Sequence, residues 1–288
     1  MSQRAASSNS IRSREQQFLL TPPPGAASSL QSIPCAVGNY GQSSTAVIVT
    51  HPFGPLGGNM HNNVVLAAVL YFQRVLGWTT CRFDFLPHSF FWQTGNLQVQ
   101  QVKQVAQLLL EGGNDDVTLG QSSGDDSQSP LRPTQIILVG YSYGSLIAAC
   151  ASADIPQCVA SISIAPAFGV ATWLLSFRSE HFLSQAALRC DIHRLFVLGD
   201  EDNFTSEAYF QSTVERRFPS KEDDNTTTTN TTQAAILKGA DHFFRRREKD
   251  LMAIIGQWLQ DIFGSLIMTD PFAELSPPTE ASSSESRE

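Results

Sequence analysis

Short apolar runs alternate with amphipathic stretches along most of the chain, and this alternation predicts strands that alternate with helices. Runs rich in Val, Ile and Leu are typical of strands that are buried on both faces of a sheet. Strands are predicted at 46–50, 79–85, 136–139, 159–164, 192–198 and 234–237. Helices are predicted at 62–76, 97–110, 146–151, 206–218 and 251–262. This order predicts an α/β fold class, in which a mostly parallel central sheet has helices on both faces.

Polar segments set the predicted domain limits. Residues 1–45 are expected to form a disordered tail with candidate edge strands at Gln17–Leu20 and within 26–45. The α/β domain is predicted to cover 46–263, and an acidic, disordered tail to cover 264–288. A single domain of this size can bury a sizeable core.

Three stretches inside the domain depart from the pattern of strands and helices. Residues 112–133 and 219–233 are polar with few apolar side chains, which is typical of surface insertions. Residues 165–190 carry a group of large apolar side chains: Phe168, Trp173, Leu174, Leu175, Phe177, Phe182 and Leu183. We expect a small cap here whose aromatic side chains line a substrate pocket; an ordinary helix packed on the sheet is the alternative.

Charge and composition exclude several kinds of partner. The 288-residue chain is 42% hydrophobic, has a formal net charge of -8 and contains no long basic stripe, so a nucleic-acid partner is not expected. The chain also lacks any run of about 18 consecutive apolar residues, so no membrane span is expected. Composition leaves the oligomeric state open.

The five cysteines indicate a reducing compartment. They are odd in number, scattered and never spaced as C-x-x-C, which argues against a disulfide framework and a zinc site. Cys81 and Cys150 lie in apolar patterns, where a thiol acts as a small hydrophobic side chain. The prediction is a cytoplasmic protein without a metal or cofactor. The Ser- and Arg-rich start, which lacks acids before Glu15, resembles a transit peptide and leaves an organelle as the alternative.

The stretch Gly140–Gly144 matches G-x-S-x-G and organises the predicted chemistry. It follows an apolar strand pattern and precedes a helix of small residues. This setting matters because the motif places its serine on a sharp strand-to-helix turn, with the hydroxyl exposed above the sheet. Ser142 is therefore the predicted nucleophile. Gly120–Gly124 matches the same pattern, but no apolar strand pattern precedes it and no helical pattern follows it, so Ser142 is preferred.

A serine nucleophile needs a histidine to accept its proton and a carboxylate to orient that histidine. Loops at the carboxyl ends of parallel strands collect such groups. Among the six histidines, His242 is preferred because it follows the last predicted strand through a loop that contains Gly239. As a purely structural residue it would only begin the final helix. Asp202 is the preferred carboxylate and Asp200 the alternative, since both follow the strand at 192–198.

The tetrahedral intermediate of such a reaction needs N–H donors for its negative oxygen. The backbone N–H of Tyr143, the residue after the nucleophile, is one predicted donor. Phe53, in the Gly- and Pro-rich loop at 51–58, is the other. The neighbouring His51 and Pro52 are also explained as a rigid turn whose histidine bonds a nearby loop. Both explanations can hold, because the donor is a backbone group.

Three motifs resemble those of small α/β-hydrolases. Residues 51–65 are similar to the His-Pro-…-Gly-Gly-x-Met-x-Asn-x-Val-Val loop of a group related to serine aminopeptidases and dipeptidyl-peptidase-like hydrolases. Gly140–Gly144 and Gly239–Phe244 are similar to that group's nucleophile turn and histidine loop. The resemblance covers 46–263. It implies an α/β-hydrolase fold with a Ser-His-Asp triad and oxyanion donors at the positions named above.

Two features bear on the substrate. The sequence departs from the group at Phe53-Gly54 and at 85–89, which line the mouth of the site, so the group's substrates do not carry over. Arg245–Arg247 follows the histidine loop and is a candidate anion-binding group, with a solvated helix start as the simpler explanation.

Two function classes fit these observations. The prediction is a serine hydrolase that cleaves a small ester, thioester or amide through an acyl-enzyme intermediate, with a small-molecule acyl substrate. The alternative is a non-catalytic α/β-hydrolase scaffold that acts as a binding module, because a fold does not guarantee an activity. The presence of Ser142, Asp202 and His242 favours the enzyme.

Overall fold

The structure, a computed structural model, describes residues 15–21, 32–86, 95–113, 118–119, 131–170, 179–219 and 231–264. Its strands are β1 (Glu15–Leu20), β2 (Ile33–Gly38), β3 (Thr45–Thr50), β4 (Thr79–Phe83), β5 (Gln135–Tyr141), β6 (Cys158–Ile164), β7 (His193–Glu201) and β8 (Thr232–Asp241). Its α-helices are α2 (Asn63–Arg74), α3 (Asn96–Glu111), α4 (Tyr143–Ala151), α6 (Ser179–Leu188), α7 (Glu207–Arg217) and α8 (Glu248–Phe263). Short 3₁₀ turns are η1 (Gly54–Leu56), η2 (Ser152–Asp154) and η3 (Phe168–Val170). The strands and helices predicted from the apolar pattern are present, with ends that differ by a few residues.

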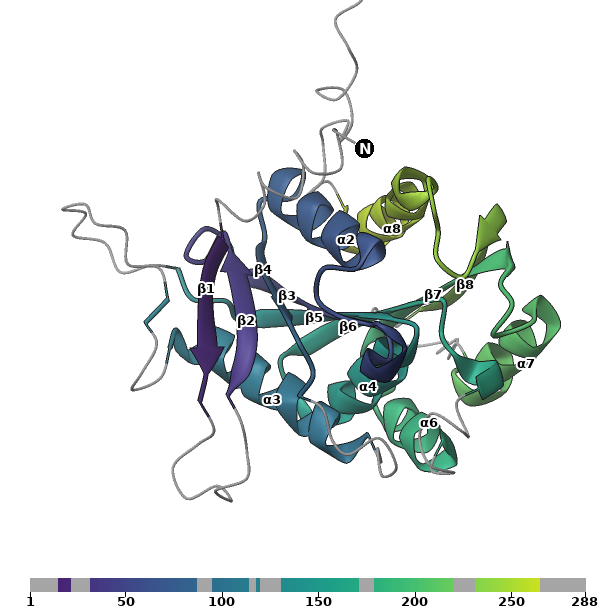
Figure 1. The fold of residues 1–288 in the computed structure, drawn as a ribbon, viewed down its shortest axis with the longest axis horizontal. Helices are drawn as coiled ribbons and strands as arrows, with labels where there is room; N and C mark the ends of the chain where they lie inside the picture. Colours follow the sequence, from purple (N-terminus) through teal and green to yellow (C-terminus); the bar gives the residue numbers. More distant parts are fainter. Residues whose placement is uncertain are drawn as a thin grey trace, which may run out of the picture.

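The strands form one sheet in the order β1-β2-β4-β3-β5-β6-β7-β8 (Figure 1). Every pair from β4 to β8 is parallel, whereas β2 pairs antiparallel with both β1 and β4. The predicted mostly parallel sheet is confirmed. Because parallel strands end at the same edge of a sheet, the loops after β3, β5, β7 and β8 lie on one side of the molecule.

Helices cover both faces of the sheet: α2 and α8 lie on one face, and α3, α4, α6 and α7 on the other (Figure 1). Successive strand residues alternate between the two cores. In β3, Ala46 and Ile48 belong to the core under α3 and α4, while Val47 and Val49 belong to the core under α2 and α8. Burial on both faces explains why this strand is a continuous apolar run in the sequence.

A buried ion pair fixes the amino-terminal edge of the sheet. The Arg82 guanidinium in β4 donates to both carboxylate oxygens of Glu15 in β1, at 3.1 and 2.6 Å. Both side chains are 0% exposed. Arg82 also donates to the Met60 carbonyl oxygen at 2.9 Å. The same guanidinium therefore connects the edge strand to the loop that leads from β3 into α2.

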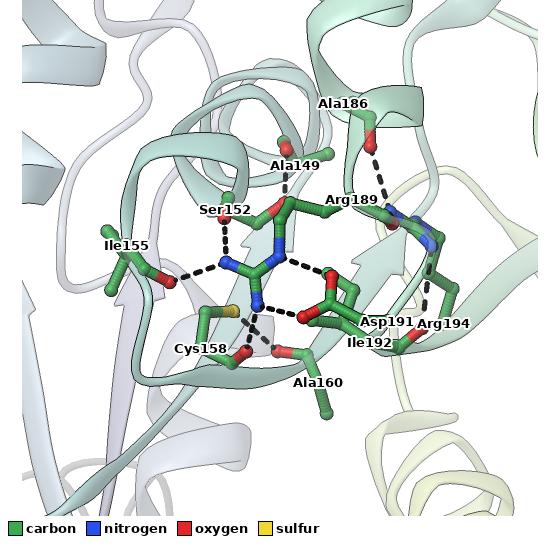
Figure 2. A network of polar contacts seen from close by, with 10 residues as sticks. All are labelled: Ala149, Ser152, Ile155, Cys158, Ala160, Ala186, Arg189, Asp191, Ile192 and Arg194. Atoms are coloured by element: carbon green, nitrogen blue, oxygen red, sulfur yellow. Dashed lines mark hydrogen bonds and ion pairs between the residues drawn. The ribbon is translucent and has the colours of Figure 1, made fainter. Parts of the chain in front are cut away.

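An arginine at the carboxyl end of α6 fastens this helix to the core (Figure 2). Arg189 pairs with Asp191 and donates to three backbone carbonyl oxygens where α4 leads through η2 into β6. These oxygens belong to Ser152, Ile155 and Cys158, at 3.2, 2.9 and 3.0 Å. The network gives partners to backbone carbonyl groups along the whole connection from α4 to β6, including that of Ser152 directly after the helix. Helix α6 packs against α4.

The stretch predicted to form a cap is only partly described. Phe168, Phe182 and Leu183 are buried in the core on the α4 side of the sheet, as expected of segments that pack on the sheet. The alternative of an ordinary packed helix therefore holds for α6. Outside the described residues lie the other large side chains of this stretch, Trp173, Leu174, Leu175 and Phe177, and most of the predicted insertions and tails.

Three further observations concern the described part of the chain. Its helices include none that is long and apolar enough to cross a membrane. Its His, Cys, Asp and Glu side chains form no group of three that could hold a metal ion. Burial raises the pKa of the Cys150 and Cys158 thiols to about 12, which keeps both protonated and unreactive near neutral pH.

Candidate active site

Three strands end at the candidate active site. Ser142 directly follows β5 and precedes α4, Asp202 follows β7, and His242 follows β8. In the sheet, β6 and β7 separate β5 from β8, so the loops that carry Asp202 and His242 reach back toward the serine. The structure brings the three predicted residues into direct hydrogen-bond contact.

The turn at Ser142 is strained and leaves no room for side chains at its flanking glycines. Ser142 has φ 57° and ψ -117°, a conformation that residues other than glycine rarely adopt. A Cβ at Gly140 would lie 2.4 Å from Ser145 Cα, and a Cβ at Gly144 would lie 2.5 Å from the His51 carbonyl oxygen. Glycine is therefore required at both positions. Strain of this kind persists only where the surrounding structure holds it, and it is concentrated at functional sites.

Two short hydrogen bonds join the three side chains. His242 Nε2 lies 2.9 Å from Ser142 Oγ, and His242 Nδ1 lies 2.7 Å from Asp202 Oδ2. An ionised carboxylate only accepts hydrogen bonds, so Nδ1 carries the ring proton and Nε2 can accept the proton of the hydroxyl. The side chains of His242 and Asp202 are 5% and 0% exposed, which limits competition from water.

The second oxygen of Asp202 holds the carboxylate in place. Asp202 Oδ1 accepts the backbone N–H groups of Phe204 and Thr205, at 2.7 and 3.0 Å. This leaves Oδ2 directed at His242 Nδ1. The turn after β7 thus positions the acid before any substrate binds.

Asp200, the alternative acid, serves the loop that carries His242. Its Oδ1 accepts the N–H of Gly239 at 2.6 Å, and its Oδ2 lies 3.8 Å from Lys238 Nζ. Arg247 supports the same loop by donating to the carbonyl oxygens of Lys238 and Gly239, at 2.6 and 3.0 Å. This geometry favours Asp202 over Asp200 as the histidine's partner, and it gives Arg247 a structural role.

Sequence reasoning missed three aromatic groups around His242. The Tyr141 hydroxyl donates to the His242 carbonyl oxygen at 3.0 Å, and burial raises the pKa of Tyr141, which keeps the donor protonated. The rings of Phe204 and Phe243 lie against the imidazole, with centroid distances of 4.4 and 5.5 Å. Tyr141 is the last residue of β5, and Phe204 and Phe243 lie in the loops after β7 and β8. The sequence pattern does not say which way their side chains point.

The two predicted oxyanion donors belong to adjoining segments of backbone. Tyr143 begins α4, and the first N–H groups of a helix have no partner within the helix. The loop after β3 passes close to this turn, because a Cβ at Gly144 would meet the His51 carbonyl oxygen. The Phe53 ring packs edge-on against the Tyr143 ring at a centroid distance of 5.1 Å. Their role as donors remains a prediction.

His51 links two loops beside the site. Its Nδ1 donates to the Pro52 carbonyl oxygen at 2.6 Å, and its Nε2 accepts the N–H of Phe85 at 2.9 Å. Burial lowers the pKa of His51, against the opposing effects of the Pro52 carbonyl and of the Asp84 carboxylate. A neutral imidazole therefore fastens the loop after β3 to the segment after β4.

The lowered pKa of His51 predicts a pH dependence of stability. In the unfolded chain a histidine titrates at about pH 6.5. Between that value and the lower folded pKa, only the unfolded chain binds the proton, so the free energy of unfolding falls as the pH falls. Urea unfolding should therefore show that the free energy of unfolding falls more between pH 7.5 and pH 5.5 in the wild type than in His51→Gln.

Part of the dependence should remain in that variant, because burial also lowers the pKa of His193. Equal losses in the wild type and His51→Gln would contradict the prediction.

No family model and no curated protein matches the sequence, but solved structures do. A serine hydrolase homologue from Coxiella burnetii superposes with a TM-score of 0.61 at 21% identity, covering 85% of this chain and 98% of its own. A serine hydrolase without a lid from Xanthomonas campestris gives 0.59 at 21% identity, covering 86% and 94%. An esterase from Pyrococcus furiosus gives 0.61 at 14% identity, covering 87% and 92%.

These similarities extend over most of each chain, and at such identities they concern the fold. The predicted relation to the smaller group with the His-Pro-…-Gly-Gly loop remains a prediction. The sheet order, the strained serine turn and the matching structures lead to one conclusion. This protein has the α/β-hydrolase fold.

Proposed function

We propose that this protein is a serine hydrolase that cleaves a small ester, thioester or amide through an acyl-enzyme intermediate on Ser142. One observation carries the proposal: the hydrogen-bonded chain from Ser142 Oγ through His242 to Asp202, with distances of 2.9 and 2.7 Å. A serine hydroxyl is a weak nucleophile on its own, and this arrangement places a base within reach of its proton.

In the proposed acylation step, Ser142 Oγ attacks the substrate carbonyl carbon while its proton moves to His242 Nε2. Asp202 holds the imidazole in the required tautomer and stabilises the imidazolium. The N–H groups of Tyr143 and Phe53 stabilise the oxyanion. The bond to the leaving group then breaks as His242 returns the proton to the leaving atom. Water attacks the acyl-enzyme by the same route, which releases the acid and restores the serine.

Proteins of the same fold that are described as serine hydrolases and esterases support the proposed type of reaction. Their substrates do not carry over at these identities. The residues Cys35, Cys81, Cys150 and Cys158 are buried as thiols, which is consistent with a reducing compartment. We therefore retain the cytoplasm as the proposed location.

Labelling with a fluorophosphonate probe tests the proposal. The probe should react with the wild-type protein, because it requires an activated serine. Labelling should disappear in Ser142→Ala and persist in Ser122→Ala, the matched change in the second G-x-S-x-G match. Absence of labelling of the folded wild type would contradict the proposal and favour the non-catalytic scaffold.

A further inference from the structure

Two phenylalanines form an apolar surface beside the candidate base. We call Phe204 and Phe243 the aromatic rim. Their ring centroids lie 4.4 and 5.5 Å from that of His242, and the two rings meet edge to face at 6.4 Å. One comes from the loop after β7 and the other from the loop after β8. The rim is therefore assembled by the same two loops that supply the acid and the base.

Both side chains of the rim reach the surface. Phe243 is 42% exposed, whereas its neighbour Phe244 is 0% exposed and belongs to the core under α2 and α8. Phe204 is partly exposed and belongs to neither core. Apolar side chains grouped at a surface beside polar reactive groups are typical of a surface that another molecule covers.

The geometry of the reaction identifies the part of the substrate that meets the rim. The leaving atom takes its proton from His242 Nε2, so it must come within hydrogen-bond distance of that nitrogen, about 3 Å. The oxyanion donors lie on the other side of Ser142, toward β3. Asp202 occupies the Nδ1 side of the His242 imidazole. The Tyr141 ring belongs to the core, and its centroid lies 5.9 Å from that of the imidazole. Among the residues that the structure describes, the rim is the apolar surface that remains beside His242 for the leaving group.

We propose that the aromatic rim binds the leaving group, and that the substrates therefore carry an apolar, aromatic alcohol, thiol or amine. The inference rests on the proposed serine hydrolase activity and adds the class of leaving group to it. Aromatic rings gain from edge-to-face or offset contacts beyond simple area burial. A leaving group without a ring would gain less from the same surface.

One ring of the rim already contacts a cation. The Arg245 guanidinium lies over the Phe243 ring, 5.0 Å from its centroid. A cationic leaving group would have to compete with Arg245 for this ring. The nearby Asp241 carboxylate accepts the N–H of Phe243 at 3.0 Å, so the rim has charges of both signs beside it.

Two acetate esters with alcohols of similar acidity, benzyl acetate and 2-methoxyethyl acetate, test this inference. Phe204→Ala and Phe243→Ala should each lower kcat/KM for benzyl acetate about tenfold, the effect of losing roughly 1.4 kcal/mol of contact. For 2-methoxyethyl acetate the change should stay within about threefold. Phe243→Tyr keeps a ring and should retain the preference. Leu188→Ala, a change at an exposed leucine of α6, is the matched control and should alter neither rate.

The outcomes separate this inference from the proposed function. If the rim variants lose kcat/KM equally for both esters, the rim only positions His242. If kcat/KM for benzyl acetate is unchanged, the rim does not bind the leaving group. Either result overturns the inference. If fluorophosphonate labels Ser142 in the wild type while neither ester is preferred, the activity stands and the rim's role falls. If the wild type is not labelled, both fall. Circular dichroism shows whether each variant is folded. If Phe243→Ala is misfolded, Phe243→Leu takes its place, because it also removes the ring.

Discussion

Replacement of His242 with alanine should lower kcat for ester hydrolysis by a factor of about 10⁶. His242 Nε2 is the nitrogen within 2.9 Å of Ser142 Oγ, so the variant leaves the hydroxyl without a base. The double variant Ser142→Ala, His242→Ala should be no slower than either single variant, because the two groups act as one unit. These effects are measured in end-point assays with an activated ester. The enzyme concentration must be high enough to detect the residual rate.

His193 provides the control for this prediction. It begins β7, whereas Asp202 follows the other end of the same strand, so His193 lies far from the candidate site along β7. His193→Ala should retain kcat within about twofold, the range typical of a change outside the site. A kcat in His242→Ala that is within tenfold of the wild type would rule out His242 as the base.

Glu15→Ala is expected to lower the free energy of unfolding by about 3–5 kcal/mol, because it leaves a buried arginine without its partner. Arg82 is 0% exposed and donates two of its hydrogen bonds to this carboxylate. The loss should appear as a lower urea midpoint. The double variant Glu15→Met, Arg82→Met should recover much of it, since removing both charges also removes the cost of burying them.

Gln17→Ala, an exposed position on the same strand, is the matched control. Its free energy of unfolding should stay within about 0.5 kcal/mol of the wild type. If Glu15→Ala were no less stable than Gln17→Ala, the ion pair would not hold the edge strand.

The fold was predictable because its central strands are buried on both faces. A strand such as β3 presents an uninterrupted apolar run in the sequence. The serine turn was predictable for a steric reason, since only glycine fits at Gly140 and Gly144. The placement of Asp202 and His242 near Ser142 was predictable because the ends of parallel strands converge at one edge of the sheet, whereas their catalytic roles stay predictions.

Other features depend on contacts that sequence order hides. Glu15 and Arg82 are 67 residues apart. The sequence shows a charged residue inside an apolar strand pattern, but it does not indicate which acidic residue pairs with it. The aromatic content of 165–190 suggested a cap, but the described residues Phe168 and Phe182 pack into the core. Helical spacing alone does not distinguish these arrangements, because both bury an apolar face.

The long chain separations in the candidate site have a consequence for folding. Ser142 and His242 are 100 residues apart, and they meet only after β5, β6, β7 and β8 are aligned in order. Contacts between distant parts of a chain form slowly, since they require large loops to close first. During refolding, recovery of turnover should therefore trail the return of helical circular dichroism. The return of the catalytic rate would then report when the strands have reached their native order.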